Sequence, residues 1–124
     1  MKIRILGNSI RLRLSQTEVR QLSEKGTVTE QTQFGPTAET TLVYTLEKRG
    51  DEPISATFSN NRIQVFLPDT TVDNWASSNE VSLENQMPLD NGNSLRILVE
   101  KDFKCLTDRN EDESDLFPNP AESC

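Results

Sequence analysis

The feature that most constrains this chain is an internal repeat in its pattern of apolar residues. Residues 1–50 align with residues 54–103 without a gap and share ten identical positions, whereas random pairing of ordinary compositions would give roughly three. Thirteen of the sixteen apolar positions in the first half meet an apolar residue in the second. The shared pattern predicts that two copies of one structural unit build the fold.

The first half is predicted to fold as strand, strand, helix, strand, strand. Alternating apolar and polar residues, or β-branched and aromatic residues, predict strands over 1–6, 10–14, 27–34 and 41–48. Ser15 and Glu18 have the spacing of a capping box, which opens a helix. Val19 and Leu22 would form the buried side of that helix, and Gly26 suits its end.

The second half repeats this plan, with strands predicted over 54–59, 62–67, 80–87 and 94–102. Asn60 and Asn61 form a hairpin turn because asparagine tolerates positive φ, and Pro68 starts a helix that buries Val72 and Trp75. We therefore expect an α+β fold, in which a duplicated β-β-α-β-β unit gives a largely antiparallel sheet or barrel of about eight strands with two short helices. Residues 1–106 would form a single domain of two repeats, 1–53 and 54–106, followed by an acidic C-terminal tail over 107–124.

Charge and composition exclude several classes of function. The formal net charge is −7, so we expect neither nucleic acid nor an anionic membrane as a partner. No apolar run is long enough to span a membrane, and no apolar segment of a secretory leader follows Lys2 and Arg4, so we expect a cytoplasmic protein. The chain contains no histidine, which excludes Ser-His-Asp catalysis and histidine-ligated zinc within one chain.

Basic residues are concentrated on one predicted strand face. If the isoleucines and leucines of the first two strands face the core, Lys2, Arg4, Arg11 and Arg13 share the opposite face of one hairpin. Arg62 and Arg96 would extend this face in the second half. One hypothesis is a phosphate- or carboxylate-binding groove, because arginine pairs with both groups through two parallel hydrogen bonds. The alternative is neutralisation by carboxylates of neighbouring strands, namely Glu30, Glu47, Glu84 and Glu100.

The C-terminal segment has no counterpart in the repeat. Asp108, Asn110 and Asp112 have the alternating oxygen spacing of calcium loops, so they are a candidate Mg²⁺ or Ca²⁺ site, although the complete EF-hand pattern is missing. Cys105 and Cys124 could close a loop if they were oxidised, and the sequence leaves their pairing open. A further hypothesis places the acidic tail over the basic hairpin, with Phe117 buried as an anchor.

The chain resembles two groups of proteins. The duplicated topology is similar to that of the triphosphate tunnel (CYTH-type) phosphohydrolases, whose N-terminal strand reads E-x-E-x-K where this chain reads KIRIL. The opening MKIRILGNSIRLRL and the close VEKDFKCLTDRNEDESDLFPNP resemble a family of small uncharacterised bacterial proteins. The first resemblance implies metal-dependent polyphosphate hydrolysis, and the second implies a small cytoplasmic bacterial protein.

We expect a non-enzymatic domain that binds a small anion or a protein partner, because no catalytic constellation is recognisable. It would need no cofactor unless the tail holds Mg²⁺ or Ca²⁺, and it would be a monomer or a homodimer. A binding domain could instead present an apolar patch around Phe66 or Trp75. The alternative is a phosphoester or polyphosphate hydrolase of the tunnel type, which would require carboxylates converging with Arg4, Arg11 and Arg13 inside a pocket.

Overall fold

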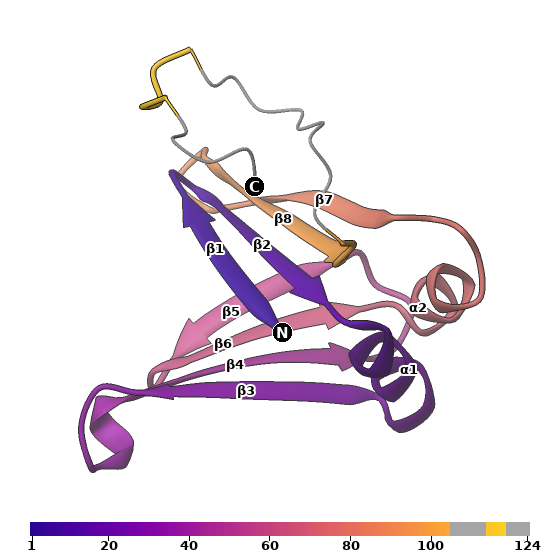
Figure 1. Ribbon diagram of the computed structural model, residues 1–124, viewed down its shortest axis with the longest axis horizontal. Helices are drawn as coiled ribbons and strands as arrows, with labels where there is room; N and C mark the ends of the chain where they lie inside the picture. Colours follow the sequence, from indigo (N-terminus) through magenta and orange to yellow (C-terminus); the bar gives the residue numbers. More distant parts are fainter. Residues whose placement is uncertain (105–113, 119–124) are drawn as a thin grey trace.

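In the part of the chain that the structure describes, eight strands and two α-helices follow one another in the predicted order (Figure 1). The computed structural model describes residues 1–104 and 114–118. The elements are β1 (Lys2–Leu6), β2 (Ser9–Leu14), α1 (Gln16–Lys25), β3 (Thr27–Gln33), β4 (Thr41–Lys48), β5 (Ser55–Ser59), β6 (Arg62–Leu67), α2 (Asp69–Ala76), β7 (Ser82–Pro88) and β8 (Ser94–Lys101), with a short 3₁₀ turn at Ala38–Thr40. The α+β class is confirmed.

The local signals act as predicted. Ser15 caps α1 through a complete capping box with Glu18, and Gly26 ends the helix in the left-handed conformation with φ of 89°. Asn60 and Asn61 turn the β5–β6 hairpin with φ of 50° and 60°. These element boundaries therefore follow from side chains adjacent to them in sequence.

The strands of the described residues form two separate four-stranded sheets and do not close into a barrel. Sheet A has the order β1-β2-β8-β7, and sheet B has the order β3-β4-β6-β5. The outer pairings of both sheets are antiparallel, while the central pairings β2–β8 and β4–β6 are parallel. Figure 1 shows the sheets drawing together beside α1 and α2 and parting toward the β1–β2 turn.

Each sheet takes two strands from each half of the chain. Leu14 of β2 aligns with Lys101 of β8, and Leu67 of β6 aligns with Lys48 of β4, so the same register recurs at an offset of 53. The two halves are therefore arranged like the two subunits of a dimer that have exchanged strands. Because the central pairings join residues far apart in the sequence, alternation within each strand could not predict them.

The predicted gap-free repeat is wrong at one strand. Thr27 opens β3 opposite Glu47, and Ser82 opens β7 opposite Glu100, so these two strands are related by an offset of 55. The connection from α2 to β7 is longer than the connection from α1 to β3, which introduces the shift. The connection from β7 to β8 is shorter than the connection from β3 to β4, which removes it. The matched identity of Val28 with Val81 is therefore accidental. Since side chains alternate with a period of two, a two-residue slip keeps every residue on its predicted face, which concealed the error.

The core follows the repeat. Among residues 1–104 and 114–118, sixteen apolar side chains are buried, and most form equivalent pairs between the halves. The fully buried pairs include Leu12 with Val65, Leu14 with Leu67, Leu22 with Trp75, and Leu46 with Val99. Trp75 is completely inaccessible and donates its indole N–H to the Val81 carbonyl at 3.1 Å. The alternative prediction of an apolar surface patch at Trp75 is therefore wrong.

Candidate functional site

The outer surface of sheet A gathers five of the six cations predicted for the anion site. In the β1–β2 pairing, Lys2 lies opposite Arg13 and Arg4 lies opposite Arg11, so all four point to the same side. The parallel β2–β8 pairing adds Arg96, which aligns with Ser9. We call this surface the basic face; its residues are Lys2, Arg4, Arg11, Arg13 and Arg96.

Arg62, the sixth predicted cation, lies elsewhere. It opens β6 in sheet B, and its Nη1 lies 3.4 Å from Oγ1 of Thr45. Its strand pairs with β4 and β5, and neither belongs to sheet A. The prediction that Arg62 extends the basic face is therefore wrong. Each half contributes strands to both sheets, and the strand that carries Arg62 belongs to sheet B.

Carboxylates on the same sheet partly neutralise the basic face. Oε2 of Glu84 lies 2.6 Å from Nε and 2.5 Å from Nη2 of Arg96. Oε1 of Glu100 lies 3.1 Å from Nε of Arg11 and 3.6 Å from Nε of Arg13, although neither contact has the geometry of a hydrogen bond. These contacts agree with two of the four predicted neutralising glutamates.

A third carboxylate comes from Asp102, which pairs with Lys2 at 2.9 Å. The other two predicted partners are wrong: Glu30 lies beside the α-ammonium group of Met1, and Glu47 lies in sheet B beside Arg49 at 3.5 Å. In the described part of the chain, the five cations of the basic face are thus accompanied by these three carboxylates. The basic face therefore stands out in a protein whose net charge is −7.

A small hollow of about 50 Å³ lies within the basic face. Arg4, Arg11 and Arg96 line it together with Ser9 and apolar neighbours. A hollow of this size has room for one small anionic group or a few waters. Arginines from three strands, β1, β2 and β8, therefore line the same hollow.

Sheet B provides an internal comparison for these cations. Sheet B has the same pairing as sheet A, yet its equivalent positions carry no charge. Ser55, Thr57, Gln64, Phe66 and Val43 replace Lys2, Arg4, Arg11, Arg13 and Arg96, respectively. The fold therefore does not need cations at these positions.

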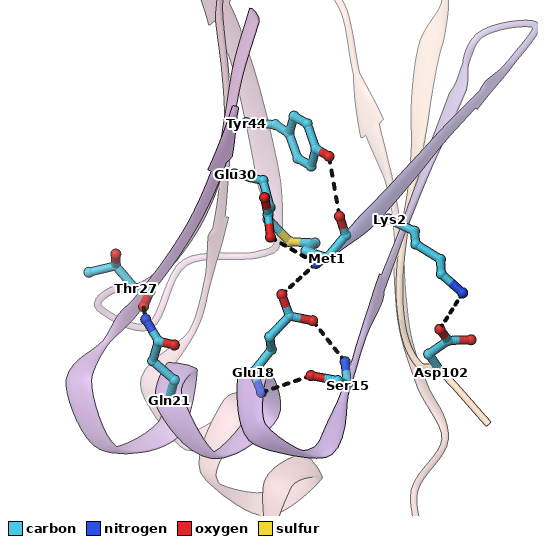
Figure 2. A network of polar contacts seen from close by, with 9 residues as sticks. All are labelled: Met1, Lys2, Ser15, Glu18, Gln21, Thr27, Glu30, Tyr44 and Asp102. Atoms are coloured by element: carbon cyan, nitrogen blue, oxygen red, sulfur yellow. Dashed lines mark hydrogen bonds and ion pairs between the residues drawn. The ribbon is translucent and has the colours of Figure 1, made fainter. Parts of the chain in front are cut away.

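A separate polar network holds the first residue between α1 and sheet B (Figure 2). The partly buried α-ammonium group of Met1 contacts Oε2 of Glu18 and lies 3.2 Å from Oε1 of Glu30. The hydroxyl of Tyr44 donates to the Met1 carbonyl at 3.2 Å, and Glu18 also accepts the Ser15 backbone N–H at 2.9 Å. The network ties β1 to α1, β3 and β4.

Charge in this network shifts two pKa values. Burial opposes the shift at Glu18, but hydrogen bonds from the Met1 ammonium and Ser15 hold its pKa below the ordinary value. Burial likewise opposes the shift at Met1, but Glu18 and Glu30 raise the pKa of the ammonium group. These contacts serve the fold, and no sequence pattern indicates them because Glu18 and Glu30 are distant from Met1 in the chain.

A larger cavity of about 470 Å³ lies between the two helices and the end of β8. Its lining carries charges of both signs, with the cations Arg20 and Lys101 and the carboxylates Glu24, Asp73 and Asp102. Asp73 accepts hydrogen bonds from Lys48 and Ser23, which lower its pKa. The mixed charges favour no single class of ligand.

Several predictions concern the C-terminal segment. Asp108, Asn110 and Asp112, together with Cys105 and Cys124, lie outside the described residues. Among residues 1–104 and 114–118, no group of three or more acidic or cysteine side chains is placed to hold a metal ion. Phe117 is described and is 96% exposed, so the prediction that it is buried as an anchor is wrong. Within the described part of the chain, no helix is long and apolar enough to cross a membrane.

Comparison with known proteins identifies a family for this chain. A protein-family model described as "Family of unknown function (DUF7009)" matches residues 1–121. The predicted membership of a family without an assigned function is confirmed, whereas the match gives no support to the triphosphate tunnel resemblance. No curated protein and no solved structure matches the chain.

Proposed function

The chain belongs to this family of unknown function, and we propose that it is a non-enzymatic domain that binds a phosphate- or carboxylate-bearing ligand on the basic face of sheet A. The observation that carries the proposal is the difference between the two sheets. One pairing scheme is used twice, and only sheet A carries the five cations.

The chemistry of the hollow supports this choice of ligand. Arginine presents a planar fork of N–H donors that matches the paired oxygens of phosphate and carboxylate. Arg4, Arg11 and Arg96 come from three hydrogen-bonded strands, so the sheet fixes their spacing before the ligand arrives. Such preorganisation reduces the entropic cost of binding.

Binding is favoured over hydrolysis by the positions of the carboxylates. Glu84 and Glu100 each form an ion pair with an arginine of the basic face, so their charges are already balanced by cations, which makes them poor candidates for holding a metal ion or activating water. We place the protein in the bacterial cytoplasm, without a nucleic-acid partner. The ligand would be a small anion or an acidic group on a protein partner.

Calorimetric and thermal-shift titrations with phosphate, pyrophosphate, triphosphate and citrate would test the proposal. An anion that binds only the folded state should add about 2.7 kcal/mol of stability at a hundred times its dissociation constant. Arg4→Gln and Arg11→Gln should each weaken binding at least tenfold. Arg62→Gln is the matched control, because this arginine lies in sheet B and outside the hollow.

Two results would overturn the proposal. The first is the absence of any anion-dependent shift, and the second is an equal loss of binding in Arg62→Gln. Release of inorganic phosphate from triphosphate by the wild-type protein, lost in Arg11→Gln, would replace binding with hydrolysis as the function of the same face.

A further inference from the structure

An apolar groove lies between the two sheets at the end of the molecule away from the helices. It encloses about 400 Å³ and is lined chiefly by Ile5, Ile10, Phe58, Ile63, Met87 and Leu95. These residues come from the ends of three hairpins, where the sheets part (Figure 1). The groove shares Ile10 with the hollow of the basic face, but its other lining residues differ from those of the hollow.

The two exposed large apolar side chains of the groove are equivalent in the repeat. Ile5 of β1 is 62% exposed, and Phe58 of β5, 53 positions later, is 70% exposed. They continue the inward-facing stripes that begin with Ile3 and Ala56, both of which pack against the core. Both halves therefore extend the apolar stripe beyond the core, to a surface that remains exposed.

The described C-terminal residues include two apolar side chains that are also exposed. Leu116 is 61% exposed and Phe117 is 96% exposed. In Figure 1 the segment 114–118, drawn in yellow, stands away from both sheets. Pro118 disfavours a helical conformation at Phe117, and neither Leu116 nor Phe117 belongs to a helix. The pair is therefore presented to solvent on irregular backbone.

The C-terminal segment and the surface of β1 carry charges of opposite sign next to their exposed apolar residues. Five acidic residues precede Leu116 within eight positions: Asp108, Glu111, Asp112, Glu113 and Asp115. On the other surface Arg4 directly precedes Ile5, so β1 carries the basic face on one side and the groove on the other. A segment that crosses β1 could place acidic residues near the arginines and its apolar residues in the groove.

We propose that the groove binds Leu116 and Phe117 of a second copy of this chain. Because Phe117 of the same chain is exposed to solvent and does not line the groove, we assign the occupant to a second molecule. If each copy inserts its segment into the other, the contact closes as a twofold dimer with two equivalent docking sites. This inference rests on the groove and does not depend on anion binding by the basic face.

Sedimentation of the full chain over a wide range of protein concentrations would test the inference. The wild type should show a monomer–dimer equilibrium, and Leu116→Ser combined with Phe117→Ser should raise the dimer dissociation constant at least tenfold, equivalent to about 1.4 kcal/mol. Phe58→Ser should have the same effect from the groove side. Phe34→Ser is the matched control, because Phe34 is 78% exposed and lies outside the groove.

A mixing experiment tests the contact directly. The Leu116→Ser/Phe117→Ser variant keeps its groove, and Phe58→Ser keeps its segment, so an equimolar mixture should form heterodimers through one docking site. A wild type that stays monomeric at every concentration would overturn the inference, as would a dimer that neither variant weakens. Loss of stability in both variants without any dimer would show docking within one chain and would also overturn it.

Discussion

Lys48 and Lys101 lie 53 positions apart in the sequence, and the ammonium group of each donates a hydrogen bond to a backbone carbonyl near the C-terminal end of a helix. Lys48 Nζ lies 2.7 Å from the Ser23 carbonyl of α1, and Lys101 Nζ lies 2.7 Å from the Ser78 carbonyl just after α2. Carbonyls at a helix end lack intrahelical partners and carry partial negative charge, so cations stabilise them. The repeat therefore preserves a polar contact as well as apolar core positions.

Removing either ammonium group should destabilise the protein. Lys48→Met and Lys101→Met keep the length of the aliphatic side chain, and each should lower the free energy of unfolding by about 1–2 kcal/mol. Lys48→Met also removes the ion pair with Asp73. Urea unfolding followed by far-UV circular dichroism measures both effects. Lys25→Met, an exposed change in the last turn of α1, should have little effect, and an equal loss there would contradict the role given to the two lysines.

The polar network around the Met1 ammonium group should make the free energy of unfolding decrease at both acidic and alkaline pH. The pKa of Glu18 lies below its ordinary value of 4.5, so its contribution is complete above that pH and is lost as the pH falls through the lowered pKa. The pKa of the Met1 ammonium lies above 8.0, so its contribution is complete below pH 8.0 and is lost as the pH rises through the raised pKa.

Glu18→Gln should flatten both limbs of this pH profile, since it removes the carboxylate while glutamine can still complete the capping box. The expected cost at neutral pH is about 0.5–1 kcal/mol. Thermal melts across the pH range measure the profile. Glu24→Gln, an exposed change on the same helix, should leave the profile unchanged. A wild-type profile retained in Glu18→Gln would show that the network does not contribute to stability.

The β5–β6 turn should respond to substitution according to backbone geometry. Asn60 has φ of 50°, a conformation that costs a β-branched residue about 1–2 kcal/mol and glycine almost nothing. Asn60→Val should therefore lower the melting temperature, whereas Asn60→Gly should leave it near the wild-type value. Differential scanning calorimetry would compare the two variants. Equal destabilisation by both would show that the asparagine side chain, rather than the backbone angle, supports the turn.

Neither half of the chain should fold as a monomer. Residues 1–53 contain β2 and β4, whose central partners β8 and β6 belong to the other half. Far-UV circular dichroism of residues 1–53 alone should show a largely unfolded chain at low concentration, and adding residues 54–104 should restore strand and helix signals. A folded monomer of residues 1–53 would contradict the exchanged arrangement of strands.

Part of the candidate site could be predicted from neighbouring residues alone. Lys2, Arg4, Arg11 and Arg13 belong to one hairpin, so alternation and a short turn were enough to place them together. Arg96 and Arg62 could not be assigned in this way. Arg96 joins the basic face through a parallel pairing with β2, and Arg62 is excluded because β6 pairs with β4.

The sequence by itself determined the strands, helices, caps and turns of this protein, and which residues face its core. These properties depend on side chains a few positions apart, as with Ser15 and Glu18 or Asn60 and Asn61. Only the tertiary structure decided which strands pair across the halves, that the sheets remain open, and that β7 is displaced by two residues. The parallel pairings join residues more than eighty positions apart in sheet A, where no local pattern specifies a partner. A two-residue shift preserves the apolar face, so alternation cannot distinguish one register from the other.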